Sequence, residues 1–131
     1  MDPNVVVFSL FPGIQESIIR HVLDAPELRS IVMRSYGSGN APQQPWLNKL
    51  LYQAAHRGVV IVNISQCVAG SVEMSRYDTG YHLKKAGVIS GIDSTVEAAV
   101  TKLMFLQGQY SDSNIIRNMM CRSIVGEITI E

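Results

Sequence analysis

The sequence predicts an α/β fold in which a four-stranded parallel sheet carries helices on both faces. Four short apolar runs lack polar alternation, which is typical of strands buried on both faces of a parallel sheet. Between them, apolar residues recur three and four positions apart, as in amphipathic helices. Because strand and helix patterns alternate without a repeat, a linker or a low-complexity tract, we expect one three-layer α/β/α domain over residues 1–131.

The first half of the chain contains two predicted strand–helix pairs. Residues 4–10 form the first strand, which Phe11–Gly13 ends, and Ile31–Ser35 form the second. Pro45 suits the first turn of the second helix, and Arg57-Gly58 ends that helix with a cation followed by a glycine. The apolar positions of the two helices are Ile18, Ile19, Val22 and Leu23, then Trp46, Leu47, Leu50, Leu51, Ala54 and Ala55.

The second half continues the same alternation. Val59–Ile64 is the third predicted strand and Gly87–Ser90 the fourth. Between them, Glu73–Lys85 has a less clear pattern, and only its latter part is expected to be helical. Ser94 and Glu97 have the spacing of a capping box, which predicts a helix that Gly108 interrupts. Asp112 or Ser113 then caps a last helix. The apolar positions of these helices are Val96, Ala99, Val100, Leu103 and Met104, then Ile115, Ile116, Met119 and Met120.

Composition narrows the class of protein. Eleven basic and eleven acidic residues give a formal net charge of zero, which argues against a nucleic-acid or anionic-membrane surface. The apolar runs are strand-length, so no transmembrane segment is expected. Met1 is followed by Asp2 and Pro3 rather than by a signal leader. A disulfide between Cys67 and Cys121 is possible, but two buried thiols in a reducing cytosol fit better, so we expect a soluble cytoplasmic protein.

Polar side chains follow the second and third predicted strands. The segment Ile31–Pro42 carries Arg34 and Asn40, and the next loop carries Ser65 and Cys67. Because ligands bind at the carboxyl ends of parallel strands, we expect the two loops to form an amino-acid-sized site. A guanidinium can hold a carboxylate through two hydrogen bonds, and an Asn amide both donates and accepts. The alternatives are a solvent-exposed turn and an Arg34 that pairs with a neighbouring acid.

No pattern of a complete catalytic site is visible. Cys67 and three histidines are present, but His21 and His56 fall on the exposed faces of predicted helices. The chain contains no G-x-S-x-G elbow, phosphate-binding loop or dinucleotide fingerprint, and the histidine spacing predicts no metal site. We therefore expect a binding domain with no catalytic residue, metal or cofactor of its own.

Several stretches closely resemble the C-terminal domain of type I, cytoplasmic bacterial L-asparaginase. They are Phe8–Gly13, Met33–Pro42, Val62–Gly80 and Asp93–Leu103, and the resemblance extends from about Pro3 to Thr129. It implies a small Rossmann-like domain with a four-stranded parallel sheet, in an enzyme that hydrolyses L-asparagine to L-aspartate and ammonia. In that family the nucleophilic threonine and the Thr-Asp-Lys group belong to an N-terminal catalytic domain, whose motifs are absent here. The fragment alone is therefore expected to be inactive. The end of the chain at GEIT makes the related archaeal amidotransferase subunit a poorer match.

The resemblance also assigns roles to individual residues. The G-x-G-N motif ends at Asn40, which would contact substrate in the active site of the partner subunit across an intimate dimer interface. Arg34 and Cys67 match an allosteric asparagine site, and Ser65 stands where relatives often have threonine. Glu73 and Tyr77 lie in a segment that approaches the partner's active site. The full enzyme would be a homo-oligomer, an intimate dimer that pairs into a dimer of dimers.

Two other functions remain to be compared with the enzyme. One is a stand-alone regulatory α/β domain that binds asparagine or another amino acid. The other is a flavodoxin-like redox domain, but Phe11–Gly13 makes a poor phosphate-binding loop after the first strand. We further expect self-association, because Leu106 beside Leu103 adds an apolar position beyond the single stripe of its helix.

Overall fold

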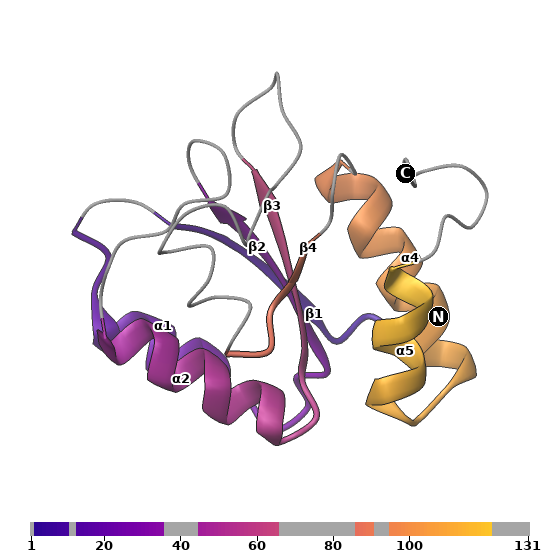
Figure 1. Cartoon of the computed structure of the whole chain (residues 1–131), viewed down its shortest axis with the longest axis horizontal. Coiled ribbons are helices and arrows are strands. Elements are labelled where there is room, and N and C mark those ends of the chain that lie inside the picture. The colour runs from indigo at the N-terminus through magenta and orange to yellow at the C-terminus, as the bar shows by residue number, and fades with distance from the viewer. Residues whose placement is uncertain (1, 11–12, 36–44, 66–85, 91–94, 122–131) are drawn as a thin grey trace.

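The computed structural model describes residues 2–10, 13–35, 45–65, 86–90 and 95–121, with the side chains of Ser35, Ser65 and Ser90 excepted. From β1 to β3, strands and helices alternate along the chain as predicted, and two helices follow β4 (Figure 1). The elements are β1 (Val5–Ser9), α1 (Glu16–Leu23), β2 (Ser30–Ser35), α2 (Pro45–His56), β3 (Val60–Ser65), β4 (Ile89–Ser90), α4 (Val96–Gln109) and α5 (Ser113–Met120). None of the helices described is long and apolar enough to cross a membrane.

The strands form a sheet in the order β1-β2-β3-β4, and every pair is parallel. The register pairs Val5 with Ser30 and Ser30 with Val60, so β1, β2 and β3 begin level with one another. β4 adds two residues beside Val62 and Asn63. The predicted α/β class with a parallel sheet is therefore confirmed.

Helices cover both faces of the sheet, α1 and α2 on one side and α4 and α5 on the other (Figure 1). Successive residues of a strand point to opposite faces. On β2, Ile31 and Met33 accordingly enter the core under α1 and α2, whereas Val32 enters the core under α4 and α5. All three are 0% exposed. Two separate apolar cores thus hold the central strands from both sides, which confirms the three-layer arrangement.

The first strand differs from its prediction. β1 lies at an edge of the sheet, and Val7 is 42% exposed instead of buried on both faces. An uninterrupted apolar run indicates a strand buried on both faces only where other elements cover both faces, and the cover of an edge strand depends on the tertiary structure. Helix faces also differ in detail, since Ile18 on α1 and Ile115 on α5 are exposed although both belong to predicted apolar stripes.

The start of α4 corrects the predicted capping box. The N-cap is Thr95, whose side-chain oxygen accepts a hydrogen bond of 3.1 Å from the backbone N–H of Ala98. This N-cap is one residue later than predicted, which places Glu97 at the second helical position instead of the third, and Ser94 lies outside the described residues. Gly108 does not interrupt the helix, which runs to Gln109. The cap of α5 is Asp112, one of the two residues predicted.

A polar network ties the N-terminal segment to the end of α4. The Arg29 guanidinium donates to Asp2 Oδ2 at 2.9 Å, to the Gln107 carbonyl at 2.7 Å and to the Tyr110 carbonyl at 3.0 Å. The Gln107 amide donates to the Asp2 carbonyl at 3.2 Å, and the Ser30 hydroxyl donates to Gln107 Oε1. The Asp2 N–H donates to a main-chain carbonyl of α4. These bonds fix the direction from which the chain enters β1.

Two predictions about the burial of side chains are wrong. Cys121, the C-cap of α5, is an exposed free cysteine and not a buried thiol. Leu106 is 0% exposed and packs in the core beneath α4, together with Leu103. It is therefore not a surplus apolar position available for self-association. The exposed aromatic residue on this helix is Phe105, at 50%.

Candidate functional site

The carboxyl ends of β2 and β3 lie next to each other, as the sequence predicted for the two polar loops. Arg34 pairs with Ile64 and Ser35 with Ser65 in the parallel register, so both strands end at the same level. Open backbone groups at such an edge are where ligands of parallel sheets bind. The strand ends from which both loops depart are therefore neighbours, and the loops themselves lie outside the described residues.

The residues of β2 and β3 that lead up to this edge are buried. Met33 and Asn63 are register partners on β2 and β3, and both are 0% exposed. Ile64, one residue further, is 5% exposed in the core beneath α4 and α5. Close packing of these residues holds the strand ends in one conformation, which preorganises the side chains that the following loops contribute.

Arg34 is the one predicted binding residue whose side chain the structure describes. It occupies the next-to-last position of β2 and is exposed. Its carbonyl accepts a 2.8 Å hydrogen bond from the N–H of Leu10, which anchors the chain just after β1 to this strand end. By strand alternation Arg34 follows Val32 on the α4 side of the sheet. A guanidinium fixed at its main chain and open to solvent can bind a carboxylate bidentately.

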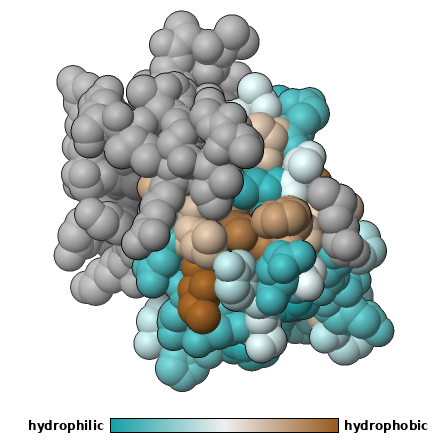
Figure 2. Space-filling view, turned by 90° about the vertical axis from the view of Figure 1, so that its right-hand side faces the viewer, coloured by the Kyte–Doolittle hydropathy of each residue, from teal (hydrophilic) through white to brown (hydrophobic). Residues whose placement is uncertain are grey.

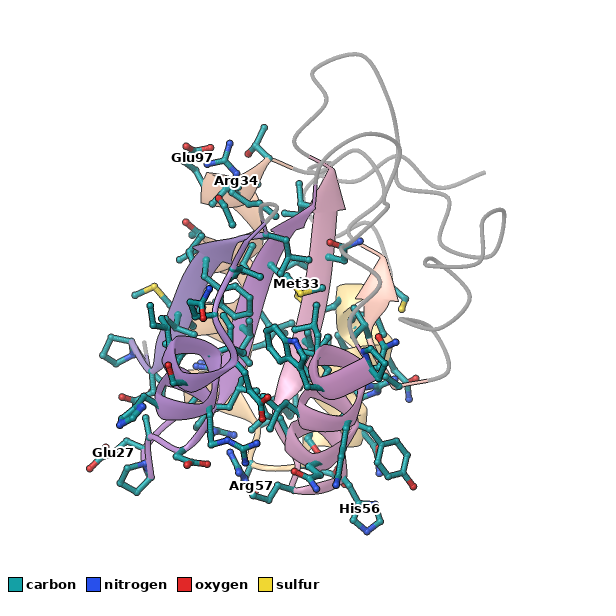
Figure 3. All side chains as sticks on the ribbon, turned by 90° about the vertical axis from the view of Figure 1, so that its left-hand side faces the viewer. Glu27, Met33, Arg34, His56, Arg57 and Glu97 are labelled. Atoms are coloured by element: carbon teal, nitrogen blue, oxygen red, sulfur yellow. The ribbon has the colours of Figure 1, made fainter. Side chains whose placement is uncertain are left out.

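An acidic residue that sequence reasoning treated only as a cap lies at the same end of the molecule. Glu97 belongs to the first turn of α4, and Figure 3 shows its side chain at the end of the molecule where Arg34 lies. The position is explained by topology, because α4 covers the β2 face on which Arg34 falls. The spacing from Ser94 had pointed to a capping role, so no sequence signal linked Glu97 to Arg34.

The side chains of the other predicted site residues lie outside the described part of the structure. Asn40, Cys67, Glu73 and Tyr77 lie outside the described residues, and of Ser65 only the backbone is described. Their assignment as substrate-binding, effector-binding and active-site neighbours therefore stays a prediction. The structure contributes the shared edge from which the loops carrying Asn40 and Cys67 depart.

The two histidines in the described regions make local contacts on helix surfaces. His21 Nδ1 lies 2.7 Å from the Ser17 carbonyl on α1, and the His56 ring stacks on Tyr52 on α2 with centroids 6.0 Å apart. Both histidines are exposed, as predicted. Among residues 2–10, 13–35, 45–65, 86–90 and 95–121, no cluster of three His, Cys, Asp or Glu side chains could hold a metal ion.

Comparisons with known proteins agree with this fold. The glutaminase/asparaginase C-terminal domain family matches residues 4–120. L-asparaginase 1 of Escherichia coli K12 is 44% identical over 94% of this chain, and the match covers 36% of that protein. A 60 kDa lysophospholipase of Mus musculus is 40% identical over 99% of this chain and 23% of its own length.

A solved structure gives the same result. The crystal structure of L-asparaginase I from Vibrio cholerae superposes with a TM-score of 0.92 at 40% identity, over 99% of this chain and 39% of that one. The chain thus spans little more than a third of the length of these two asparaginases. Since the family match extends over nearly the whole described fold, the chain belongs to the glutaminase/asparaginase C-terminal domain family.

Proposed function

We propose that this chain acts as the C-terminal part of a longer L-asparaginase, an amidohydrolase that converts L-asparagine to L-aspartate and ammonia. The observation that carries the proposal is the match to L-asparaginase 1 at 44% identity, over 94% of this chain but 36% of the enzyme. The hydrolytic threonine would then lie in an N-terminal domain outside this chain. The 131-residue chain would bind and position ligands without catalysing hydrolysis.

Within that enzyme, the β2–β3 edge would serve two ligand sites. Asn40 would contact substrate in the active site of a partner subunit, with Glu73 and Tyr77 near it. Arg34, Ser65 and Cys67 would hold a second asparagine as an allosteric effector. The adjacent ends of β2 and β3 support the effector site, because they bring the Arg34 backbone beside the segment that leads to Ser65 and Cys67.

The proposal includes a cytoplasmic homo-oligomer, as the type I resemblance implies. Figure 2 views the face formed by α4 and α5, where apolar side chains gather among hydrophilic ones. Phe105 on α4 is 50% exposed and Ile115 on α5 is 40% exposed. Large apolar side chains that remain in solvent are candidates for burial between subunits or domains. The exposed side chains of Phe105 and Ile115, and not Leu106, therefore support the proposed self-association.

A chimera tests the activity directly. In E. coli L-asparaginase 1, the segment matched by this chain is replaced with the corresponding residues of this chain, and ammonia release from asparagine is measured. We expect activity from the chimera and none from the 131-residue chain alone or from the enzyme lacking the segment. A chimera that is folded and assembled by circular dichroism and sedimentation, yet inactive, would contradict the proposal. So would hydrolysis by the chain alone after removal of host enzyme.

A second candidate is a stand-alone amino-acid-binding regulatory domain. Arg34 favours it to the extent that an exposed guanidinium at a strand end can bind a carboxylate without a catalytic domain. Calorimetric titration of asparagine into the chain alone separates the two functions. Micromolar binding by the chain, combined with an inactive chimera, would favour the regulatory domain. Because one relative is named a lysophospholipase, the chimera is also assayed with glutamine and a lysophospholipid.

A further inference from the structure

Two adjoining clefts lie at the end of the sheet opposite the proposed ligand sites. The larger, of about 680 Å³, is lined by residues of the α1–β2 turn, the end of α2 and the start of α5, among them Asp24, Arg29 and Arg57. The smaller, of about 300 Å³, lies between α2, α5 and the segment that leads into β4, and Arg117 lines it. Val59 and Ser113 line both clefts, so the clefts adjoin there, and the pair of clefts is called the groove below.

Arg57 and Arg117 are each held by an uncharged acceptor. The Arg57 guanidinium donates to the carbonyl of Leu23 at the end of α1, and Arg117 Nη1 donates to the Gly87 carbonyl at 2.6 Å. A main-chain carbonyl orients a guanidinium but does not neutralise its charge. Neither arginine takes part in an ion pair recorded within the described parts of the chain. Both charges are therefore available to a ligand, from groups already fixed in position.

The remaining charges of the groove have defined positions. The charge of Arg29 is offset by its ion pair with Asp2, at 2.9 Å. The groove then contains two positive charges, on Arg57 and Arg117, and one negative charge, on Asp24. Its net charge is therefore +1. The chain as a whole has a formal charge of zero, so this excess is local.

Ser113, which lines both clefts, lies near Gly58 of the larger cleft. Gly58 has φ of +99°, and a Cβ there would lie 3.6 Å from the Ser113 hydroxyl. A side chain at position 58 would thus be in van der Waals contact with the first residue of α5. Arg57 lines the larger cleft and Arg117 the smaller, so the two available guanidinium groups belong to different clefts.

From this arrangement we propose that the groove binds a small dianion whose two oxyanion groups stand at opposite ends, of the dicarboxylate class. One carboxylate is held by Arg57 in the larger cleft and the other by Arg117 in the smaller. Ser113 Oγ donates to the ligand between them. Two separated guanidinium groups favour two separated anionic groups over a single compact one, and Asp24 disfavours a ligand of higher charge.

The groove is separate from the proposed asparagine sites. Figure 3 shows Arg57 and His56 at one end of the molecule and Arg34 at the other. Arg34 lies at the carboxyl end of β2, whereas Arg57 lies shortly before the first residue of β3. Binding at this groove therefore does not depend on the function proposed above, and loss of either can be observed without the other.

Titration of the 131-residue chain with succinate, monitored by amide NMR at constant ionic strength, tests the proposal. We expect saturable shifts of Gly58 and Ser113, together with residues of both clefts. Arg57→Gln and Arg117→Gln should each weaken succinate binding by about tenfold or more, since each removes a charge-assisted contact. Arg20→Gln removes an exposed arginine of α1 outside both clefts and should leave the affinity unchanged. Asp24→Asn should tighten binding.

Acetate and inorganic phosphate distinguish the ligand classes in the same experiment. Acetate, with one carboxylate, should bind at least about tenfold more weakly than succinate. Phosphate binding as tight as that of succinate would overturn the two-position dianion site. Non-saturable shifts, or equal losses in Arg20→Gln and Arg57→Gln, would show charge screening in place of a site. If an arginine-to-glutamine variant is unfolded by its melt, Arg57→Lys keeps the charge but loses the guanidinium fork, and unchanged succinate affinity there would also contradict the proposal.

Discussion

Replacing Arg29 with methionine should lower the free energy of unfolding by about 2–4 kcal/mol, because one side chain holds three acceptors. These acceptors are the Asp2 carboxylate and the carbonyls of Gln107 and Tyr110. Each carbonyl bond contributes about 1 kcal/mol net, and a charged acceptor about 1.5–3 kcal/mol when buried. The Arg29 side chain is 30% exposed, so solvent screening reduces the Asp2 contribution to about 1 kcal/mol.

A double-mutant cycle measured by urea unfolding isolates the interaction energy between Arg29 and Asp2. The set is the parent chain, Arg29→Met, Asp2→Asn and the double variant. Asparagine at position 2 keeps an oxygen that can accept from the N–H of Asn4, which now donates to Asp2 Oδ1 at 3.0 Å. Arg29→Met should therefore cost about 1 kcal/mol less in the Asp2→Asn background. Arg20→Met removes an exposed ion pair with Glu16 on α1 and should cost under about 0.5 kcal/mol.

The pH dependence of the same variants gives an independent check. The Arg29 hydrogen bond, then the hydrogen bond from the backbone of Asn4, hold the pKa of Asp2 below its ordinary value of 3.8. A carboxyl whose pKa is lower in the folded state stabilises the fold above its unfolded pKa, and this stabilisation is lost as the pH falls through the folded value. The stability difference between the parent and Asp2→Asn should thus shrink below about pH 4.

Two results would refute this account of the N-terminal network. One is an Arg29→Met variant that loses less than about 0.5 kcal/mol, the range of an ordinary surface change. The other is a stability difference between the parent and Asp2→Asn that stays constant from about pH 6 to pH 2. Asp24→Asn serves as the matched carboxylate control for the acid titration, because its carboxylate is exposed.

Three further predictions concern other parts of the fold and the proposed sites. Gly87→Ala should destabilise the chain by about 1–3 kcal/mol in urea unfolding, because φ is +99° and the new Cβ would stand 3.0 Å from the Cβ of Ala55. Thr95→Ala should cost about 1 kcal/mol by removing the cap of α4, with Thr95→Ser close to the parent. In the active chimera, Arg34→Ala should weaken the effector response to asparagine about ten- to hundredfold, while Asn40→Ala lowers kcat/KM and keeps the cooperativity. Identical kinetic defects in the last two variants, with unchanged melting temperatures, would contradict the two-site assignment.

Local periodicity accounts for the part of the fold that was predicted correctly. Buried strands and amphipathic helices leave patterns over five to fourteen consecutive residues, as β2 (Ser30–Ser35) and α4 (Val96–Gln109) do. Such patterns carry little information on position within the sheet. Val7 and Ile18 were predicted to be buried but are 42% and 60% exposed. Val7 is exposed because β1 lies at an edge of the sheet, and Ile18 because α1 packs through Ile19 and Leu23.

The candidate ligand edge was predicted for a similar reason. Once the strands were known to be parallel and consecutive, Arg34 and Ser65 had to fall at one edge, and the register confirms this for their backbones. Glu97 was not linked to this edge, because sequence spacing says nothing of which strand face a later helix covers. The cap of α4 was misplaced by one residue, since Ser94 and Thr95 are both suitable N-cap residues.

The α/β class, the order of the elements and the resemblance to the asparaginase family follow from the amino-acid sequence, because all three depend on residues that are near one another along the chain. Which distant groups meet depends on how the elements pack. Arg29 contacts Gln107 and Tyr110 across 78 and 81 positions of sequence, and the basic groove combines Arg57 with Arg117. Hydrogen bonds and charge pairs act over a few ångströms, so their partners are set by how helices pack on the sheet and leave no periodic trace in the sequence.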